Sequence, residues 1–204
     1  MIITGPAIQE FVEQGKIHIA PFNPENIGPN SYDLTLAPGL LVYHGPDGAP
    51  PSPVHPLDVR AENKTQSIEI PEDGYVLRPG ILYLGSTVEA AGSDSFVPCI
   101  EGRSSIGRLG IATHVAAGFG DIGFKQRWTL EITVIHPTKI YAGIRICQVY
   151  FHRYEGTKLL YGERPGSKYA NSSGVEPSRS YLDFSGRSHD EDPPGRDPLA
   201  PAAG

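Results

Sequence analysis

The sequence has no long apolar run and few cysteines. No window approaches about 18 uninterrupted apolar residues, and the N-terminus lacks a charged segment followed by an apolar stretch, so neither a membrane-spanning helix nor a secretory signal is expected. The only cysteines, Cys99 and Cys147, lie far apart in apolar surroundings, which is typical of buried free thiols rather than of a disulfide framework. We therefore expect a cytoplasmic protein without a membrane partner.

Positive charge is also scarce. The chain carries a formal net charge of -6 at pH 7, whereas affinity for a phosphate backbone needs clustered Lys and Arg. We therefore expect no nucleic-acid partner. A mononucleotide is not excluded, because it needs only a few cations in one pocket.

Turn-forming residues are abundant, with 24 Gly and 20 Pro among 204 residues. Thr4 followed by Ile8, Phe11 and Val12 predicts one short helix that ends at Gly15. From residue 17 onward, short alternating runs bounded by Gly, Pro, Asn or Asp predict many strands, and the proline-rich stretch 45–56 predicts an exposed loop.

These patterns predict a single mostly β domain over residues 1–184, a closed or double-sheet barrel with a short N-terminal helix. Residues 185–204 contain almost nothing to bury and are expected to form a disordered tail.

One predicted strand carries a carboxylate in its middle. In 128–134 the apolar residues alternate strictly, so Glu131 faces away from them together with Thr129 and Thr133. Such a carboxylate must lie on a wet face, be paired, or line a pocket. Glu131 is a candidate proton-transfer group, and a solvated strand face is the structural alternative.

A second cluster combines arginines with small hydroxyl residues. Arg103, Ser104, Ser105 and Arg108 lie at a predicted helix start, where backbone N–H groups and guanidinium groups can bind phosphate. The alternative is a serine that caps the helix beside solvated arginines. Downstream, the glycine-rich stretch 116–123 contains a single acid, Asp121, which could equally be a solvated turn residue.

The zinc signature of many deaminases is missing. It consists of H-x-E followed by P-C-x-x-C. His189-Asp190-Glu191 fits the first part, but no cysteine follows it, and Pro98-Cys99 has no second cysteine three positions on. We therefore expect no zinc site.

Taken together, these motifs resemble the dCTP deaminases, a branch of the dUTPase-like proteins, including their bifunctional dUMP-forming members. The resemblance covers roughly residues 1–183 and is carried by Gly28-Pro29-Asn30-Ser31-Tyr32-Asp33, Gly102-Arg103-Ser104-Ser105, Arg108-Leu109-Gly110, His114, Ala117-Gly118-Phe119, Asp121, Leu130-Glu131, Gln148, Tyr161 and Ser167-Lys168-Tyr169-Ala170.

The resemblance implies a distorted β-barrel homotrimer with active sites between subunits, which acts on dCTP with Mg²⁺ on the triphosphate and without zinc. Glu131 would move protons, with Arg108 beside it, while Ser104 and the carbonyl of Ala117 would position the water. The residues implied to bind substrate are Arg103, Ser105, Tyr161, Lys168 and Ser172 for the phosphates, Asp121 for the deoxyribose and Thr129 for the base, together with Leu130.

Five positions depart from the usual family pattern, namely Ala116, Gly120, Ile122, Gln126 and Ser172. They leave substrate preference and closure of a C-terminal lid open. Two other functions also stay open. One is a dUTP pyrophosphohydrolase, although that group usually lacks a counterpart of Glu131. The other is a catalytically silent nucleotide-binding regulatory module.

Overall fold

The computed structural model describes residues 1–46, 48–52, 54–170 and 172–184. The predicted tail, 185–204, lies outside the described residues. The elements are α1 Gly5–Glu13, β1 His18–Ala20, η1 Pro24–Asn26, β2 Tyr32–Tyr43, β3 Thr65–Glu69, β4 Tyr75–Leu77, β5 Tyr83–Gly92, β6 Val97–Gly102, α2 Ser104–Gly107, β7 Ile111–Ala112, β8 Arg127–Val134, β9 Thr138–Ile140, β10 Arg145–His152, η2 Tyr161–Glu163 and η3 Ser180–Phe184.

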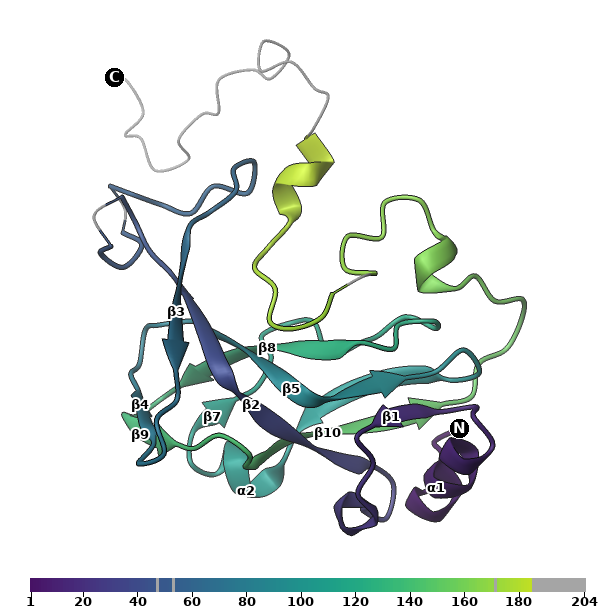
Figure 1. Cartoon of the computed structure of the whole chain (residues 1–204). Helices are drawn as coiled ribbons and strands as arrows, with labels where there is room; N and C mark the ends of the chain where they lie inside the picture. Colours follow the sequence, from purple (N-terminus) through teal and green to yellow (C-terminus); the bar gives the residue numbers. More distant parts are fainter. Residues whose placement is uncertain (47, 53, 171, 185–204) are drawn as a thin grey trace, which may run out of the picture.

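The strands form one large antiparallel sheet and a small one. The large sheet has the order β6-β10-β2-β5-β8-β7, with β1 paired to β5 and β3 paired to β2, while β4 and β9 form a separate pair. Register shifts interrupt β2, β5 and β10, and such bulges bend strands. The sheet therefore curls into a nearly closed barrel (Figure 1), and the predicted mostly β barrel is confirmed.

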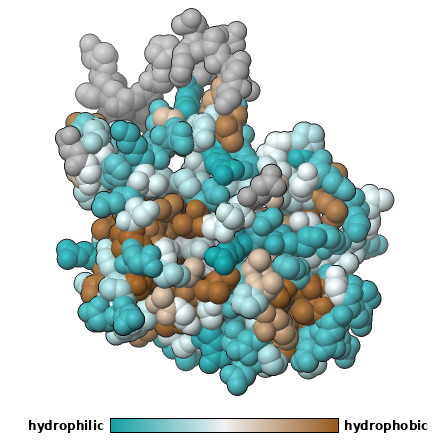
Figure 2. All heavy atoms as spheres, viewed as in Figure 1, coloured by the Kyte–Doolittle hydropathy of each residue, from teal (hydrophilic) through white to brown (hydrophobic). Residues whose placement is uncertain are grey.

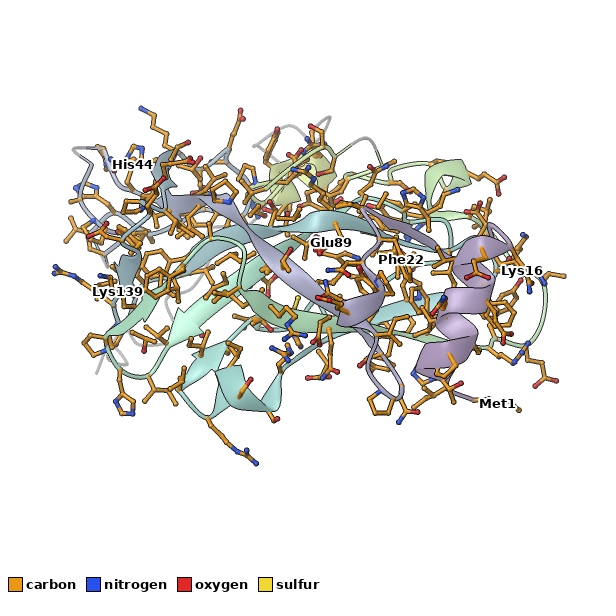
Figure 3. All side chains as sticks on the ribbon, turned by 60° about the horizontal axis from the view of Figure 1, so that its bottom comes forward. Met1, Lys16, Phe22, His44, Glu89 and Lys139 are labelled. Atoms are coloured by element: carbon orange, nitrogen blue, oxygen red, sulfur yellow. The ribbon has the colours of Figure 1, made fainter. Side chains whose placement is uncertain are left out.

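The predicted N-terminal helix is present. In α1, Ile8 is fully buried, and Phe11 and Val12 pack against the core. Gly15 follows the helix with φ 68°, a left-handed conformation that glycine adopts without strain. The helix packs at one end of the barrel beside β1, with Lys16 just beyond it (Figures 1 and 3).

Strand β8 sorts its side chains as its alternation predicts. Trp128, Leu130, Ile132 and Val134 are buried in the core, whereas Thr129, Glu131 and Thr133 are only partly buried on the other face. The C-terminal segment, residues 161–170 and 172–184, returns over this second face (Figure 1). Apolar side chains are gathered in the body of the molecule below that segment (Figure 2).

Candidate functional site

A pocket of about 560 Å³ opens on the outward face of β8. Its walls are β8, the turn that precedes β8, the loop around residues 57–63 and the C-terminal segment. Six of the residues expected in the site line it, namely Ala117, Asp121, Thr129, Glu131, Tyr161 and Ser172. Ala117 and Ser172, which are 55 positions apart in the sequence, therefore share one cavity.

Glu131 is held in this pocket by its own neighbourhood. One carboxylate oxygen, Oε2, accepts hydrogen bonds from the backbone N–H groups of Val115 at 2.8 Å and Ala116 at 3.2 Å. The backbone N–H of Glu131 donates to the carbonyl of Thr113 at 3.0 Å. The other carboxylate oxygen, Oε1, has no hydrogen-bond partner within the described residues. This geometry fits a positioned pocket carboxylate better than a solvated strand residue.

The turn before β8 lies close against the barrel. A Cβ atom at Gly120 would lie 2.3 Å from Cη2 of Trp128 and 2.8 Å from the carbonyl oxygen of Pro98. The N–H of Gly120 donates to that same carbonyl at 2.9 Å. Glycine at position 120 is therefore required by the large buried side chain of Trp128, which gives a physical reason for this departure from the family pattern.

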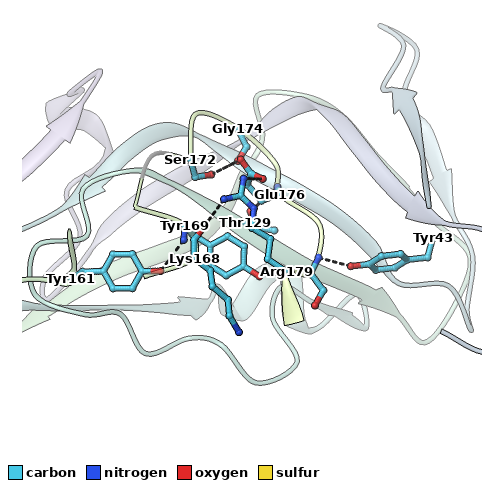
Figure 4. A network of polar contacts seen from close by, with 10 residues as sticks. Tyr43, Thr129, Tyr161, Lys168, Tyr169, Ser172, Gly174, Glu176 and Arg179 are labelled. Atoms are coloured by element: carbon cyan, nitrogen blue, oxygen red, sulfur yellow. Dashed lines mark hydrogen bonds and ion pairs between the residues drawn. The ribbon is translucent and has the colours of Figure 1, made fainter. Parts of the chain in front are cut away.

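The C-terminal segment closes the pocket through a polar network (Figure 4). The N–H of Glu176 donates to Oγ1 of Thr129 at 3.1 Å. The carboxylate of Glu176 accepts from the hydroxyl of Ser172 at 3.2 Å and from Nη2 of Arg179 at 2.8 Å. Ser172 is thus a buried structural contact within the C-terminal segment in this conformation. The side chain of Gln126 holds the same segment by donating to the carbonyl of Ala170 at 3.0 Å.

Further contacts dock the segment on the loop side of the pocket. The hydroxyl of Tyr43 accepts from the N–H of Ser178 at 2.8 Å, and the hydroxyl of Ser180 donates to the carbonyl of Val59 at 2.7 Å. The guanidinium of Arg179 lies 5.5 Å from the ring centre of Tyr169. Sequence reasoning missed Tyr43, Glu176 and Arg179, because no local pattern links partners up to 135 positions apart.

Two expected phosphate ligands belong to this same segment. The ammonium group of Lys168 forms an ion pair with Asp183. The hydroxyl of Tyr161 accepts from the N–H of Tyr169 at 3.1 Å. Tyr161 lines the pocket and Lys168 does not, and in this conformation their polar atoms are engaged within the C-terminal segment.

The structure separates the remaining expected residues from this pocket. Arg103, Ser104, Ser105 and Arg108 lie at α2, and none of them lines the pocket of the same chain (Figure 1). The helix α2 has only four residues, and a helix this short has almost no macrodipole. An anion bound here would therefore depend on the guanidinium and backbone N–H groups rather than on a helix dipole. The side chain of Leu130 is fully buried in the core, so only its backbone could reach a ligand.

Among the described residues that line the pocket there is no cysteine. Cys99 and Cys147 are buried and unpaired, and burial raises the pKa of both thiols above the ordinary value. Within the described residues, no group of three His, Cys, Asp or Glu side chains could hold a metal ion, while His189, Asp190 and Glu191 lie outside them. No helix in the described part of the chain is long and apolar enough to cross a membrane.

Comparison with known proteins places these features in a family. A family model described as dCTP deaminase-like matches residues 2–154. Proteins named "dCTP deaminase, dUMP-forming" from Clostridium acetobutylicum and Leptospira biflexa serovar Patoc are 47% and 44% identical to the chain over 184 residues, which span 90% of this chain and 99% and 98% of theirs. The crystal structure of 2'-deoxycytidine 5'-triphosphate deaminase from Agrobacterium tumefaciens shares the fold, with a TM-score of 0.57 at 19% identity over 75% of this chain and 48% of that one. By its matched length and by the near-complete coverage of these relatives, the chain belongs to the dCTP deaminase-like family.

Proposed function

We propose that this chain hydrolyses dCTP to dUTP and ammonia without zinc, and then hydrolyses the bound dUTP to dUMP and pyrophosphate. The observation that carries the proposal is the carboxylate of Glu131, held by two backbone N–H groups at the wall of a pocket large enough for a nucleoside. The two steps consume two waters and release one ammonia and one pyrophosphate. The names of the relatives support both steps.

Glu131 acts as the proton shuttle in the first step. Its free oxygen takes a proton from the water that attacks C4 of the ring and delivers it to N3. It then takes the proton of the new C4 hydroxyl and delivers it to the departing amine, which leaves as ammonia. The carbonyl of Ala117 holds the water from the same side of the pocket. The hydroxyl of Ser104 is its second ligand, and Arg108 stabilises the charge that develops on Glu131.

A single chain does not bring these groups together, so we propose a homotrimer in which α2 of one copy completes the pocket of the next. Closed cyclic symmetry is the usual arrangement of such oligomers. Large apolar side chains are exposed around α2 and the turns that flank β8, namely Leu109, Val115, Phe119 and Ile135 at 56%, 66%, 74% and 72%. Exposed apolar side chains gathered in this way are typical of an interaction surface.

Magnesium enters this proposal with the nucleotide. The described side chains contain no three-ligand metal cluster, whereas Mg²⁺ is commonly bound through substrate phosphates and water. Bound there, the ion neutralises charge on the triphosphate. The protein's part is to hold the phosphates with Arg103, Ser105, Tyr161 and Lys168.

We also propose that the protein is cytoplasmic.

The test is a product assay with dCTP, dUTP and dCMP in the presence of Mg²⁺. Anion-exchange separation of nucleotides, with ammonia and pyrophosphate measured in parallel, should show dCTP converted to dUMP with equal amounts of both small products. Ammonia with accumulating dUTP would reduce the proposal to a deaminase alone. Pyrophosphate from dUTP without ammonia from dCTP would identify a dUTP pyrophosphohydrolase, and binding without turnover would identify a silent nucleotide-binding module.

A further inference from the structure

An ion cluster on the outer face of the barrel joins three strands. The carboxylate of Asp33 on β2 lies 3.0 Å from Nε of Arg103, which follows β6, and 3.6 Å from Nη1 of Arg145 on β10. Nη1 of Arg103 also donates to the carbonyl oxygen of Arg145 at 3.0 Å. One carboxylate thus links two guanidinium groups, and the two arginines also contact each other directly.

A β-bulge places Arg145 in this cluster. The register of β10 against β2 shifts between Arg145 and Cys147, and the adjacent residues Ile146 and Cys147 are both completely buried. With strict alternation, Arg145 would share the inward face of Cys147 and Val149. The extra residue instead turns it to the outward face, where Gln148 also lies, and re-aiming a side chain is a known use of bulges.

The backbone on which Arg103 stands is fixed from the same face. Nε2 of Gln148 donates to the carbonyl of Gly102 at 3.0 Å, and Oε1 of Gln148 accepts from the hydroxyl of Ser31 at 2.7 Å. Arg103 therefore leaves a braced strand end and immediately precedes Ser104 and Ser105. The guanidinium group of Arg103 therefore has little conformational freedom, so less conformational entropy is lost when a ligand binds to it.

Glu89, the nearby acid, does not neutralise Arg145, because its carboxylate is hydrogen-bonded elsewhere. Glu89 is buried in the middle of the sheet beside β2 (Figure 3), with its carboxylate accepting from the N–H and the hydroxyl of Thr35 at 2.8 and 2.9 Å. Within the described part of the chain, Asp33 is the only carboxylate within salt-bridge distance of Arg103 or Arg145. Nearly half of the Arg145 side chain, 48%, remains exposed, so the side chain is accessible to a ligand.

We propose that Arg145 is a second phosphate-contacting cation of the nucleotide site and that Asp33 is the positioning residue of both arginines. The inference rests on the proposed function, because it takes Arg103 as a phosphate ligand. Two guanidinium groups oriented by one carboxylate present several N–H donors in fixed directions, an arrangement suited to bidentate binding of phosphate oxygens. The ligand class is a nucleoside triphosphate or another condensed phosphate.

The first experiment compares Arg145→Gln with Arg78→Gln, which removes the same charge from an exposed arginine at the end of β4. Isothermal titration with dCTP and Mg²⁺, with inorganic triphosphate, and with deoxycytidine measures the contribution of each part of the ligand. Arg145→Gln should weaken binding of dCTP and inorganic triphosphate by about tenfold to a hundredfold, as expected for a lost charge-assisted hydrogen bond. Binding of deoxycytidine, and all binding by Arg78→Gln, should stay within about twofold of the unmodified protein.

The second experiment separates positioning from simple electrostatics. Asp33→Asn removes a negative charge next to bound phosphate, so electrostatics alone predicts tighter binding. Because the two guanidinium groups lose their common anchor, we expect weaker binding of inorganic triphosphate instead, by about threefold to tenfold. Tighter or unchanged binding would refute the positioning role of Asp33.

The outcomes also distinguish this inference from the proposed function. If the unmodified protein binds inorganic triphosphate but neither binds nor converts dCTP, the proposed function fails while the anion site stands. If the unmodified protein converts dCTP and Arg145→Gln binds both phosphate ligands normally, Arg145 has only a structural role. Light scattering and thermal unfolding of each variant accompany the titrations. If Arg145→Gln alters assembly, Arg145→Lys is tested in its place. The Lys variant keeps the charge but lacks the planar group, so an intermediate affinity is expected and full affinity would refute bidentate binding.

Discussion

Replacing Glu131 by glutamine tests the proposed chemistry most directly. Glutamine keeps the size of the side chain, and its carbonyl oxygen can still accept from the N–H groups of Val115 and Ala116. Its amide nitrogen would then occupy the position of the free carboxylate oxygen. That NH₂ group can donate to N3 of cytosine, but it cannot take a proton from water. Deamination should therefore fall by about 10²–10⁴-fold while dCTP still binds.

The cost in stability should be small. The two backbone hydrogen bonds remain but change from charge-assisted to neutral, a difference of roughly 1 kcal/mol each at full strength. Glu131 is only partly buried, so solvent screening reduces the total to about 1 kcal/mol. For a protein of this size, that loss lowers the melting temperature by about 2–4 °C.

The assay combines ammonia release in single turnovers with isothermal titration of dCTP and a thermal melt. Ser104→Ala is the matched comparison, and it should lose less activity than Glu131→Gln, because the carbonyl of Ala117 still holds the water. Near-normal deamination by Glu131→Gln would refute the assignment of this residue as the proton shuttle. A large fall in melting temperature together with lost binding would show that the carboxylate is structural.

Four further predictions follow from the fold and the site. Light scattering should find three chains per particle, and a fully active monomer would contradict the shared site. A zinc-specific chelator should leave turnover unchanged, whereas EDTA should lower it until Mg²⁺ is added back; loss of activity with the zinc chelator alone would contradict the mechanism. Truncation after Phe184 should leave assembly and deamination intact, and loss of either would give residues 185–204 a structural role. Gly120→Ala should reduce stability by about 1–3 kcal/mol, because the new Cβ overlaps Trp128; an unchanged calorimetric melt would refute this close packing.

Local pattern was sufficient for the outline of the fold. The alternation in 128–134 correctly separated the buried Trp128 and Leu130 from the outward Glu131, because side chains along a strand alternate between its faces whatever lies around it. Glycine and proline marked the strand ends, and the spaced motifs indicated the family. The short reach of such patterns also limited the prediction at α2, where the helix start was predicted correctly but the pattern could not show that the helix has only four residues.

The tertiary structure decided how these pieces meet. The sequence by itself determined that Glu131 faces outward, but only the folded chain brings the N–H groups of Val115 and Ala116 to it and lays Glu176 against Thr129. A bulge in β10, which no residue type in the sequence indicates, places Arg145 beside Asp33. The physical reason is that a one-residue shift in register moves side chains to the opposite face of a sheet. That shift depends on how distant strands pack, and so the composition of the site was set by packing rather than by local sequence.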